Sequence, residues 1–102
     1  MDFTEKDKAT LLKIYGGVQK TLDEDIRQLE EAADVTEYTF GKEADLSDER
    51  EITRETAIRK LGRETWLSGL VRSAFHWTAM RYIDPKDPLK GFVWFNSKRL
   101  FK

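Results

Sequence analysis

The 102-residue sequence contains no cysteine and a single histidine, and each shortage excludes a class of site. Without cysteine there is no disulfide framework and no thiolate metal site. With one histidine, a zinc centre is not expected either, because such sites draw on several imidazole or thiolate ligands. The lack of thiols fits a reducing compartment, so we expect the protein to be cytoplasmic.

Long apolar runs are also missing. No stretch approaches the roughly 18 consecutive apolar residues of a membrane-spanning helix. The start, MDFTEKDK, lacks the basic-then-apolar profile of a secretion signal. We therefore expect no membrane association.

Apolar and charged residues are both plentiful. Hydrophobic residues make up 39% of the chain and aromatic residues 12%, which suffices for a folded core. Charged residues make up 36%, above the usual quarter, so the surface is densely charged. The length predicts a single domain spanning residues 1–102.

The two halves of the chain carry opposite charge. Residues 1–51 hold fifteen acidic and seven basic side chains, a net of −8, whereas residues 52–102 hold four and eleven, a net of +7. Such asymmetry can indicate a basic face for nucleic acid. It can equally let the halves attract each other, within one chain or between two. We favour the second interpretation because the acidic half would repel a phosphate backbone.

The segment RETWLSGLVRSAFHWTAMRYI, residues 63–83, is the most apolar part of the chain. Its apolar residues recur at helical spacing, and the tryptophans form a second apolar side. A helix that is apolar on two sides is usually enclosed by neighbours. The pattern predicts a buried aromatic helix over residues 63–83, in which we expect the following side chains to be buried: Trp66, Leu70, Phe75 and Trp77.

The first third of the chain predicts one long amphipathic helix, over residues 5–33. Thr4 and Asp7 have the spacing of a capping box, and apolar residues then recur every three or four positions. A straight helix of this length would extend about 42 Å, too long for a domain whose radius of gyration is about 13 Å. It either bends at Gly16-Gly17 or projects to a partner. We expect self-association into a homodimer along a seam formed by Tyr15, Val18, Leu22 and Leu29.

The middle of the chain predicts a connector or short strand over 34–46, followed by a helix over 48–61. Residues 35–40 are rich in strand formers. Ser47 is a favourable N-cap with acidic residues after it, and Gly62 suits the position just past a helix end. Alternatively, this helix continues through Gly62 into the next one.

The last segment, 84–102, predicts a strand or tail. Pro85 and Pro88 end the preceding helix, and Gly91–Phe95 is the best strand candidate. It could pair with residues 35–40. The fold class we predict is therefore mainly α, a helical bundle of three helices with a small two-stranded β element.

No residue pattern indicates catalysis. His76 lacks a recognisable nucleophile and an orienting carboxylate, and the acidic cluster at 23–31 lacks the ligand spacing of a calcium loop. We expect no catalytic residue, no metal and no cofactor. Thr65, Gly69 and Ser73 form a strip of small residues that would let another helix approach. The alternative is a ligand groove walled by Trp66 and Trp77.

Residues 56–72, TAIRKLGRETWLSGLVR, resemble the helix-turn-helix units of DNA-binding proteins in the positions of Ala57, Leu61 and Gly62. They depart from that pattern at Arg63, where an apolar residue is usual, and in a second helix that is mostly apolar. A nucleic-acid-binding protein would use a basic contact surface, with Trp94 and Phe101 stacking on bases. That surface would comprise Arg59, Lys60, Arg63, Arg72, Lys98, Arg99 and Lys102.

The function we expect is a non-enzymatic interaction module that self-associates and regulates or inhibits another macromolecule. The observations behind it are the long helix, the charge split and more aromatic residues than a small core needs. The alternative is a nucleic-acid-binding protein. A small-molecule binder with a helical groove is a third hypothesis, which no motif supports.

Overall fold

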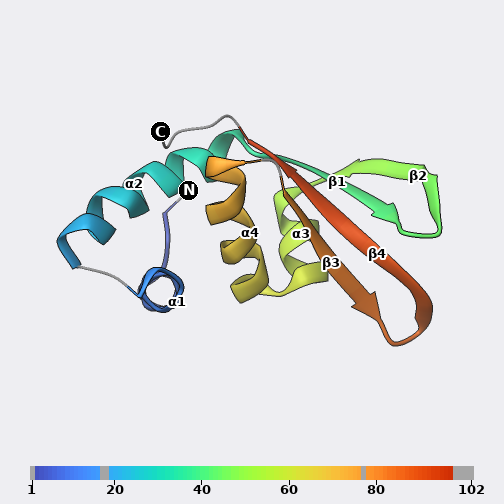
Figure 1. The fold of residues 1–102 in the computed structure, drawn as a ribbon, viewed down its shortest axis with the longest axis horizontal. Helices are drawn as coiled ribbons and strands as arrows, with labels where there is room; N and C mark the ends of the chain where they lie inside the picture. Colours follow the sequence, from blue (N-terminus) through green and yellow to red (C-terminus); the bar gives the residue numbers. More distant parts are fainter. Residues whose placement is uncertain (1, 17–18, 77, 98–102) are drawn as a thin grey trace.

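The structure, a computed structural model, describes residues 2–16, 19–76 and 78–97; for residues 19–21, 45–47 and 88 it describes the backbone only. Helices and strands alternate in pairs along the chain (Figure 1). The fold is therefore α+β, and the prediction of a mainly α, three-helix bundle is wrong. In chain order the elements are α1 (Glu5–Tyr15), α2 (Gln19–Val35), β1 (Glu37–Lys42), β2 (Asp45–Ile52), α3 (Arg54–Leu61), α4 (Arg63–Phe75), β3 (Thr78–Asp84) and β4 (Asp87–Asn96).

The strands form one antiparallel sheet in the order β2-β1-β4-β3. It consists of two hairpins joined through β1 and β4, where Tyr38 lies opposite Phe95. The predicted pairing of residues 35–40 with 92–95 is thus confirmed, although the sheet has four strands and not two. The β1–β4 pairing brings together residues about 49 to 59 positions apart in the sequence.

The helices form two layers on one side of the sheet. α3 and α4 contact the strands, whereas α1 and α2 pack against α4. α4 is consequently enclosed between the sheet and the N-terminal helices. Figure 1 shows the helices gathered toward one end of the sheet, with both hairpins extending beyond them.

The predicted helix over 5–33 is two helices. Gly16 ends α1 in the left-handed conformation, with φ 57°, and its N–H donates to the carbonyl of Leu12. Glycine adopts this conformation without a Cβ clash, so the chain can turn there. The predicted capping box is confirmed, since Asp7 N–H donates to Thr4 Oγ1 at 3.1 Å and Thr4 N–H donates to Asp7 Oδ2 at 3.0 Å. Gly17 lies outside the described residues.

The prediction of a helix over 48–61 is also wrong for the first part of that range. That part belongs to β2, and α3 begins only at Arg54, with Thr53 rather than Ser47 as its N-cap. Thr53 Oγ1 accepts a hydrogen bond from Thr56 N–H at 3.2 Å. Gly62 ends α3 as predicted, with φ 83°, and α4 begins at the following residue.

The predicted helix over 63–83 ends at Phe75, and the rest of that segment is β3. Exposure alternates along β3, with Thr78, Met80 and Tyr82 less exposed than the residues between them. Such alternation belongs to a strand that packs on one face. Hydrogen bonding to β4 therefore overrode the helical spacing of the sequence.

The core is centred on α4. Trp66 and Leu70 are fully buried, as predicted, and Trp66 Nε1–H donates to the Tyr38 hydroxyl at 3.0 Å. Phe75, which was also predicted to be buried, is 36% exposed and lines a hollow at the end of α4. Trp77 lies outside the described residues.

The small-residue strip admits the sheet and not another helix. A Cβ added at Gly69 would lie 2.7 Å from the Phe95 ring and 2.8 Å from Met80 Cγ. Ser73 is buried, and its carbonyl accepts a hydrogen bond from the Ser97 hydroxyl at 2.8 Å. Because Trp66 is enclosed, it cannot wall the ligand groove considered as the alternative.

Candidate functional site

The residues of the predicted seam are largely used inside the chain. Leu22 and Leu29 are buried in the core, and Tyr15 is half-buried against it. The Tyr15 hydroxyl has no hydrogen-bond partner in the described part of the chain, and burial raises its pKa to about 12, with a smaller contribution from Asp25. Val18 lies outside the described residues. These side chains leave little surface for a second molecule.

The basic residues of the nucleic-acid hypothesis are placed in different surroundings. Arg63 forms a bidentate ion pair with Asp7, with Nε–Oδ1 2.6 Å and Nη2–Oδ2 2.7 Å, and this pair lowers the pKa of Asp7. Lys60 Nζ lies 4.3 Å from the centre of the Phe40 ring. Arg59 on α3 and Arg72 on α4 are exposed. The remaining three, Lys98, Arg99 and Lys102, lie outside the described residues.

The helix-turn-helix resemblance corresponds to a real helix pair, α3 and α4. Its second helix, however, has Trp66, Leu67 and Leu70 buried against other elements. A recognition helix must present side chains to a DNA groove. In this fold α4 is a core helix instead.

The side chain of His76 is exposed at the end of α4. The backbone N–H of His76 donates to the backbone carbonyl of Arg72. Within residues 2–16, 19–76 and 78–97, no group of three or more His, Cys, Asp or Glu side chains could hold a metal ion. No helix in those ranges is long and apolar enough to cross a bilayer.

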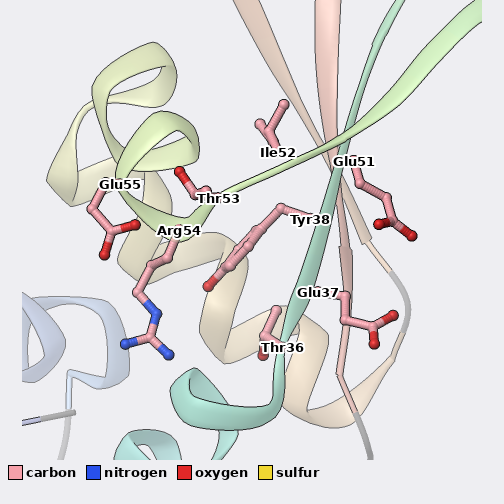
Figure 2. Close-up of a pocket in the computed structure, with 8 residues that line it drawn as sticks. All are labelled: Thr36, Glu37, Tyr38, Glu51, Ile52, Thr53, Arg54 and Glu55. Atoms are coloured by element: carbon pink, nitrogen blue, oxygen red, sulfur yellow. The ribbon is translucent and has the colours of Figure 1, made fainter.

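A polar notch opens where β1 and β2 part to join α2 and α3 (Figure 2). Its volume is about 480 Å³. Tyr38 lies at its floor, and Figure 2 shows the side chain of Arg54 directed away from the strands. The notch is lined by Thr36, Glu37, Tyr38, Glu51, Ile52, Thr53, Arg54 and Glu55.

The polar groups of the notch are mostly engaged within the chain. Arg54 Nη2 donates to the carbonyl of Ala33 and lies 3.5 Å from Asp34 Oδ1. The Tyr38 hydroxyl accepts from Trp66, and burial raises its pKa. A nucleophile activated by a general base is not among the lining residues. The notch can hold a polar group but has no groups arranged for chemistry.

The second surface is the face of the sheet that points away from α3 and α4. On β1 and β4, Tyr38, Phe40, Val93 and Phe95 turn toward the helices and are buried. The alternate residues therefore point outward. In one row across the outer face, Glu51, Thr39, Trp94 and Ala79 lie side by side; in the next, Gly41, Phe92 and Arg81 do.

Trp94 is the projecting side chain of this outer face. Trp94 is 38% exposed, whereas the neighbouring Phe92 has its ring over Gly41 and is almost buried. The two rings meet edge to face, with centroids 6.0 Å apart. Beside Trp94 is a shallow hollow of about 370 Å³, lined by Thr39, Glu49, Trp94 and Asn96.

From the sequence, Trp94 was predicted only as a base-stacking residue, with no place in the self-association seam. The available signal was that residues 92–95, FVWF, are apolar on both faces of a strand. A strand of that kind is typically covered on both sides. The register of the sheet decides which face of this strand the helices leave open. The sequence did not predict that register.

Comparison of the chain with protein-family models, with curated proteins and with solved structures finds no match.

Proposed function

We propose that this protein is a non-enzymatic interaction module that self-associates through the outer face of its sheet. The observation that carries the proposal is Trp94, a large aromatic ring left 38% exposed at the centre of that face. Exposed aromatic residues surrounded by polar ones are typical of interface centres. The occupant we propose for this face is a second copy of the chain.

The shape of the outer face supports a second copy as the occupant. Along β1 the outward residues Thr39 and Gly41 are small, whereas β4 presents Trp94. A two-fold rotation about an axis parallel to the strands, between β1 and β4, lays each β4 over the other copy's β1. Each Trp94 then fills the hollow above the partner's Thr39. Aligned sheets pack about 10 Å apart, so a tryptophan side chain can bridge the layers.

The charges of the outer face support the same axis. The rotation places β2, with Glu49 and Glu51, opposite β3 of the other copy, with Arg81. Arg81 Nη2 lies 2.9 Å from Glu43 Oε1 in its own chain, but both side chains are exposed and such pairs contribute little. Arg81 can therefore share its contacts with the partner's Glu49. A rotation axis perpendicular to the strands would instead place acidic β2 on acidic β2.

The test is the solution mass of the native protein across micromolar concentrations, measured by light scattering. We expect a dimer that Trp94→Glu converts into a folded monomer, because a charge would be buried at the centre of the interface. Val35→Glu is the matched control, since Val35 is an exposed aliphatic residue at the end of α2. A native protein that is monomeric throughout, or equal effects of both variants, would contradict the proposal.

A charge exchange tests the orientation of the two copies. Glu49→Arg should weaken the dimer by placing arginine opposite the partner's Arg81. Adding Arg81→Glu to the same chain should restore it, because each opposed pair regains opposite charges. Additive weakening by the two substitutions would exclude this axis.

The wider role we propose is regulation or inhibition of another macromolecule in the cytoplasm. A dimer formed through the sheet faces leaves α3 and both edge strands accessible. The support is geometric: those elements remain at the surface after the outer faces have met. No specific observation favours the nucleic-acid alternative.

A further inference from the structure

The two edge strands of the sheet differ in how they are protected. β2 carries four consecutive exposed charged residues, from Asp48 to Glu51. Charged side chains on an edge strand oppose pairing with another strand. β3, at the other edge, has Arg81 as its one charged side chain before the terminal Asp84. In the part of the chain that the structure describes, β3 pairs with β4 alone.

A hollow of about 440 Å³ lies beside the start of β3, against the last turn of α4. Val71 and Phe75 give it an apolar wall, and Phe75 is 36% exposed. Arg72 supplies a positive charge, and none of the described lining residues carries a carboxylate. The lining residues are Val71, Arg72, Phe75, His76 and Thr78.

We propose that β3 and this hollow form a docking site for an extended, acidic segment of a partner protein. The segment adds to the free edge of β3 as a further strand, so that main-chain hydrogen bonds hold it. One apolar side chain rests on Val71 and Phe75, and a neighbouring carboxylate pairs with Arg72. Strand addition beside a helix-lined pocket combines affinity from the backbone with specificity from the pocket.

Charge selects this occupant over a basic segment. Among the described residues that line the hollow, Arg72 carries a positive charge and none is acidic, so a carboxylate is attracted and an ammonium repelled. This site is separate from the outer face, and Trp94→Glu should leave it intact.

The probes are fluorescein-labelled seven-residue peptides that alternate threonine with an apolar residue (valine, leucine or phenylalanine) and carry glutamate beside the central one. We expect saturable binding in fluorescence polarisation. Replacing the glutamate by lysine should weaken binding about tenfold, as for the loss of a charge-assisted contact. No saturable binding by any of the three peptides would overturn the proposal.

Backbone N-methylation of the peptide tests the strand addition without altering the protein. Alternate residues of an edge-bound strand direct their N–H groups toward the sheet. Methylating one alternate set should abolish binding, whereas methylating the other should leave it within about twofold of the parent. Equal effects of both sets would show that no strand is added.

Variants of the protein locate the site. Arg72→Ala should lower affinity about tenfold, whereas Arg59→Ala, which removes an exposed arginine from α3, should change nothing. Amide resonances of residues 71–76 and 78–84 should shift on titration while those of β2 remain fixed. Shifts confined to β2 or to the outer face, or shifts of residues 71–76 that follow protein concentration without peptide, would refute the proposed site.

Discussion

Trp66 and Trp94 lie on opposite sides of the same sheet and have opposite surroundings. Trp66 reaches the covered side from α4, is fully buried, and has its Nε1–H bonded to the Tyr38 hydroxyl at 3.0 Å. Trp94 belongs to β4 itself and is 38% exposed. Both rings are large apolar surfaces, but only Trp66 is satisfied within the chain. The covered side accounts for the fold, and the outer side is the interface that we propose.

The neighbours of the two tryptophans differ in the same way. On the covered side Phe3 meets Trp66 edge to face, with ring centroids 6.3 Å apart, inside a continuous apolar cluster. On the outer side Trp94 is flanked by Thr39 and Glu49. Small or charged neighbours around one aromatic ring do not build a core, but they do form the rim of an interface.

The largest expected effect comes from the same substitution at both tryptophans. Trp66→Ala should lower the free energy of unfolding by about 3–5 kcal/mol, because it leaves a large cavity in the core. Trp94→Ala should cost less, about 1–2 kcal/mol in the monomer, since the ring is partly hydrated already and its removal leaves no enclosed cavity. Urea denaturation at concentrations low enough to keep the protein monomeric measures both. Equal losses would remove the distinction between the two sides.

The ion pair between Asp7 and Arg63 joins α1 to α4 on the covered side. Asp7 is almost fully buried, whereas the Arg63 side chain is 40% exposed. Asp7→Asn should therefore lower the free energy of unfolding by about 2–3 kcal/mol. This loss is smaller than that expected for breaking an ion pair in which both side chains are buried. Glu5→Gln, in the same turn of α1 but exposed, is the control and should be nearly neutral.

The same pair predicts how stability depends on pH. Hydrogen bonding to Arg63 lowers the pKa of Asp7 below its ordinary value of 3.8 in the folded protein. Its contribution is therefore present above that ordinary value and is lost as the pH falls through the lowered folded-state pKa. Over this pH range, the free energy of unfolding should fall less in Asp7→Asn than in the native protein. The same loss of stability at low pH in both proteins would show that the ion pair with Arg63 does not lower the pKa of Asp7.

Gly69 tests how closely α4 approaches the sheet. A Cβ there would meet the Phe95 ring and Met80 at less than 3 Å, so Gly69→Ala should destabilise by about 1–3 kcal/mol through overpacking. The helix propensity of alanine would otherwise stabilise the protein by up to about 1 kcal/mol. Ser68→Ala, one position earlier and partly exposed, should be neutral or stabilising. A stabilised Gly69→Ala would mean that the layers are further apart.

The smallest expected effect concerns Tyr15. Its hydroxyl is buried without a partner among the described residues, so Tyr15→Phe should be within about 1 kcal/mol of the native stability. Because the folded-state pKa is raised to about 12, the native protein should lose stability as the pH rises from about 10, the unfolded value, toward 12. Tyr15→Phe should lose less over that range. Identical alkaline profiles would show that Tyr15 is not buried.

Local signals in the sequence predicted the parts of the fold that local interactions determine. The Thr4 capping box and the end of α3 at Gly62 are of this kind. The strands β2 and β3 could not be found in that way. The acidic residues of β2 suit the first turn of a helix, and Ala79, Met80 and Tyr82 continue the helical spacing of α4. Both segments are strands because β1 and β4 pair with them, and such pairing overrides local preference.

The candidate surface was harder to predict than the fold. Phe92 and Trp94 are as apolar as Val93 and Phe95, so composition does not say which pair faces the helices. That choice follows from the register of β1 against β4 and from the close approach of Gly69 to Phe95. The bend at Gly16 was one of the two outcomes predicted for the N-terminal segment, and it lets both helices pack against α4, so that Leu22 and Leu29 of the predicted seam are buried in the core.

The most direct test of the central claim is fluorine NMR of protein labelled with 5-fluorotryptophan, recorded over a dilution series. Single Trp→Phe variants assign the resonances of Trp66 and Trp94. Self-association through the outer sheet face predicts that the Trp94 resonance shifts as the protein is diluted, while the Trp66 resonance stays fixed. A Trp94 resonance that is independent of concentration, in a protein whose mass shows it to associate, would place the interface elsewhere and contradict the account.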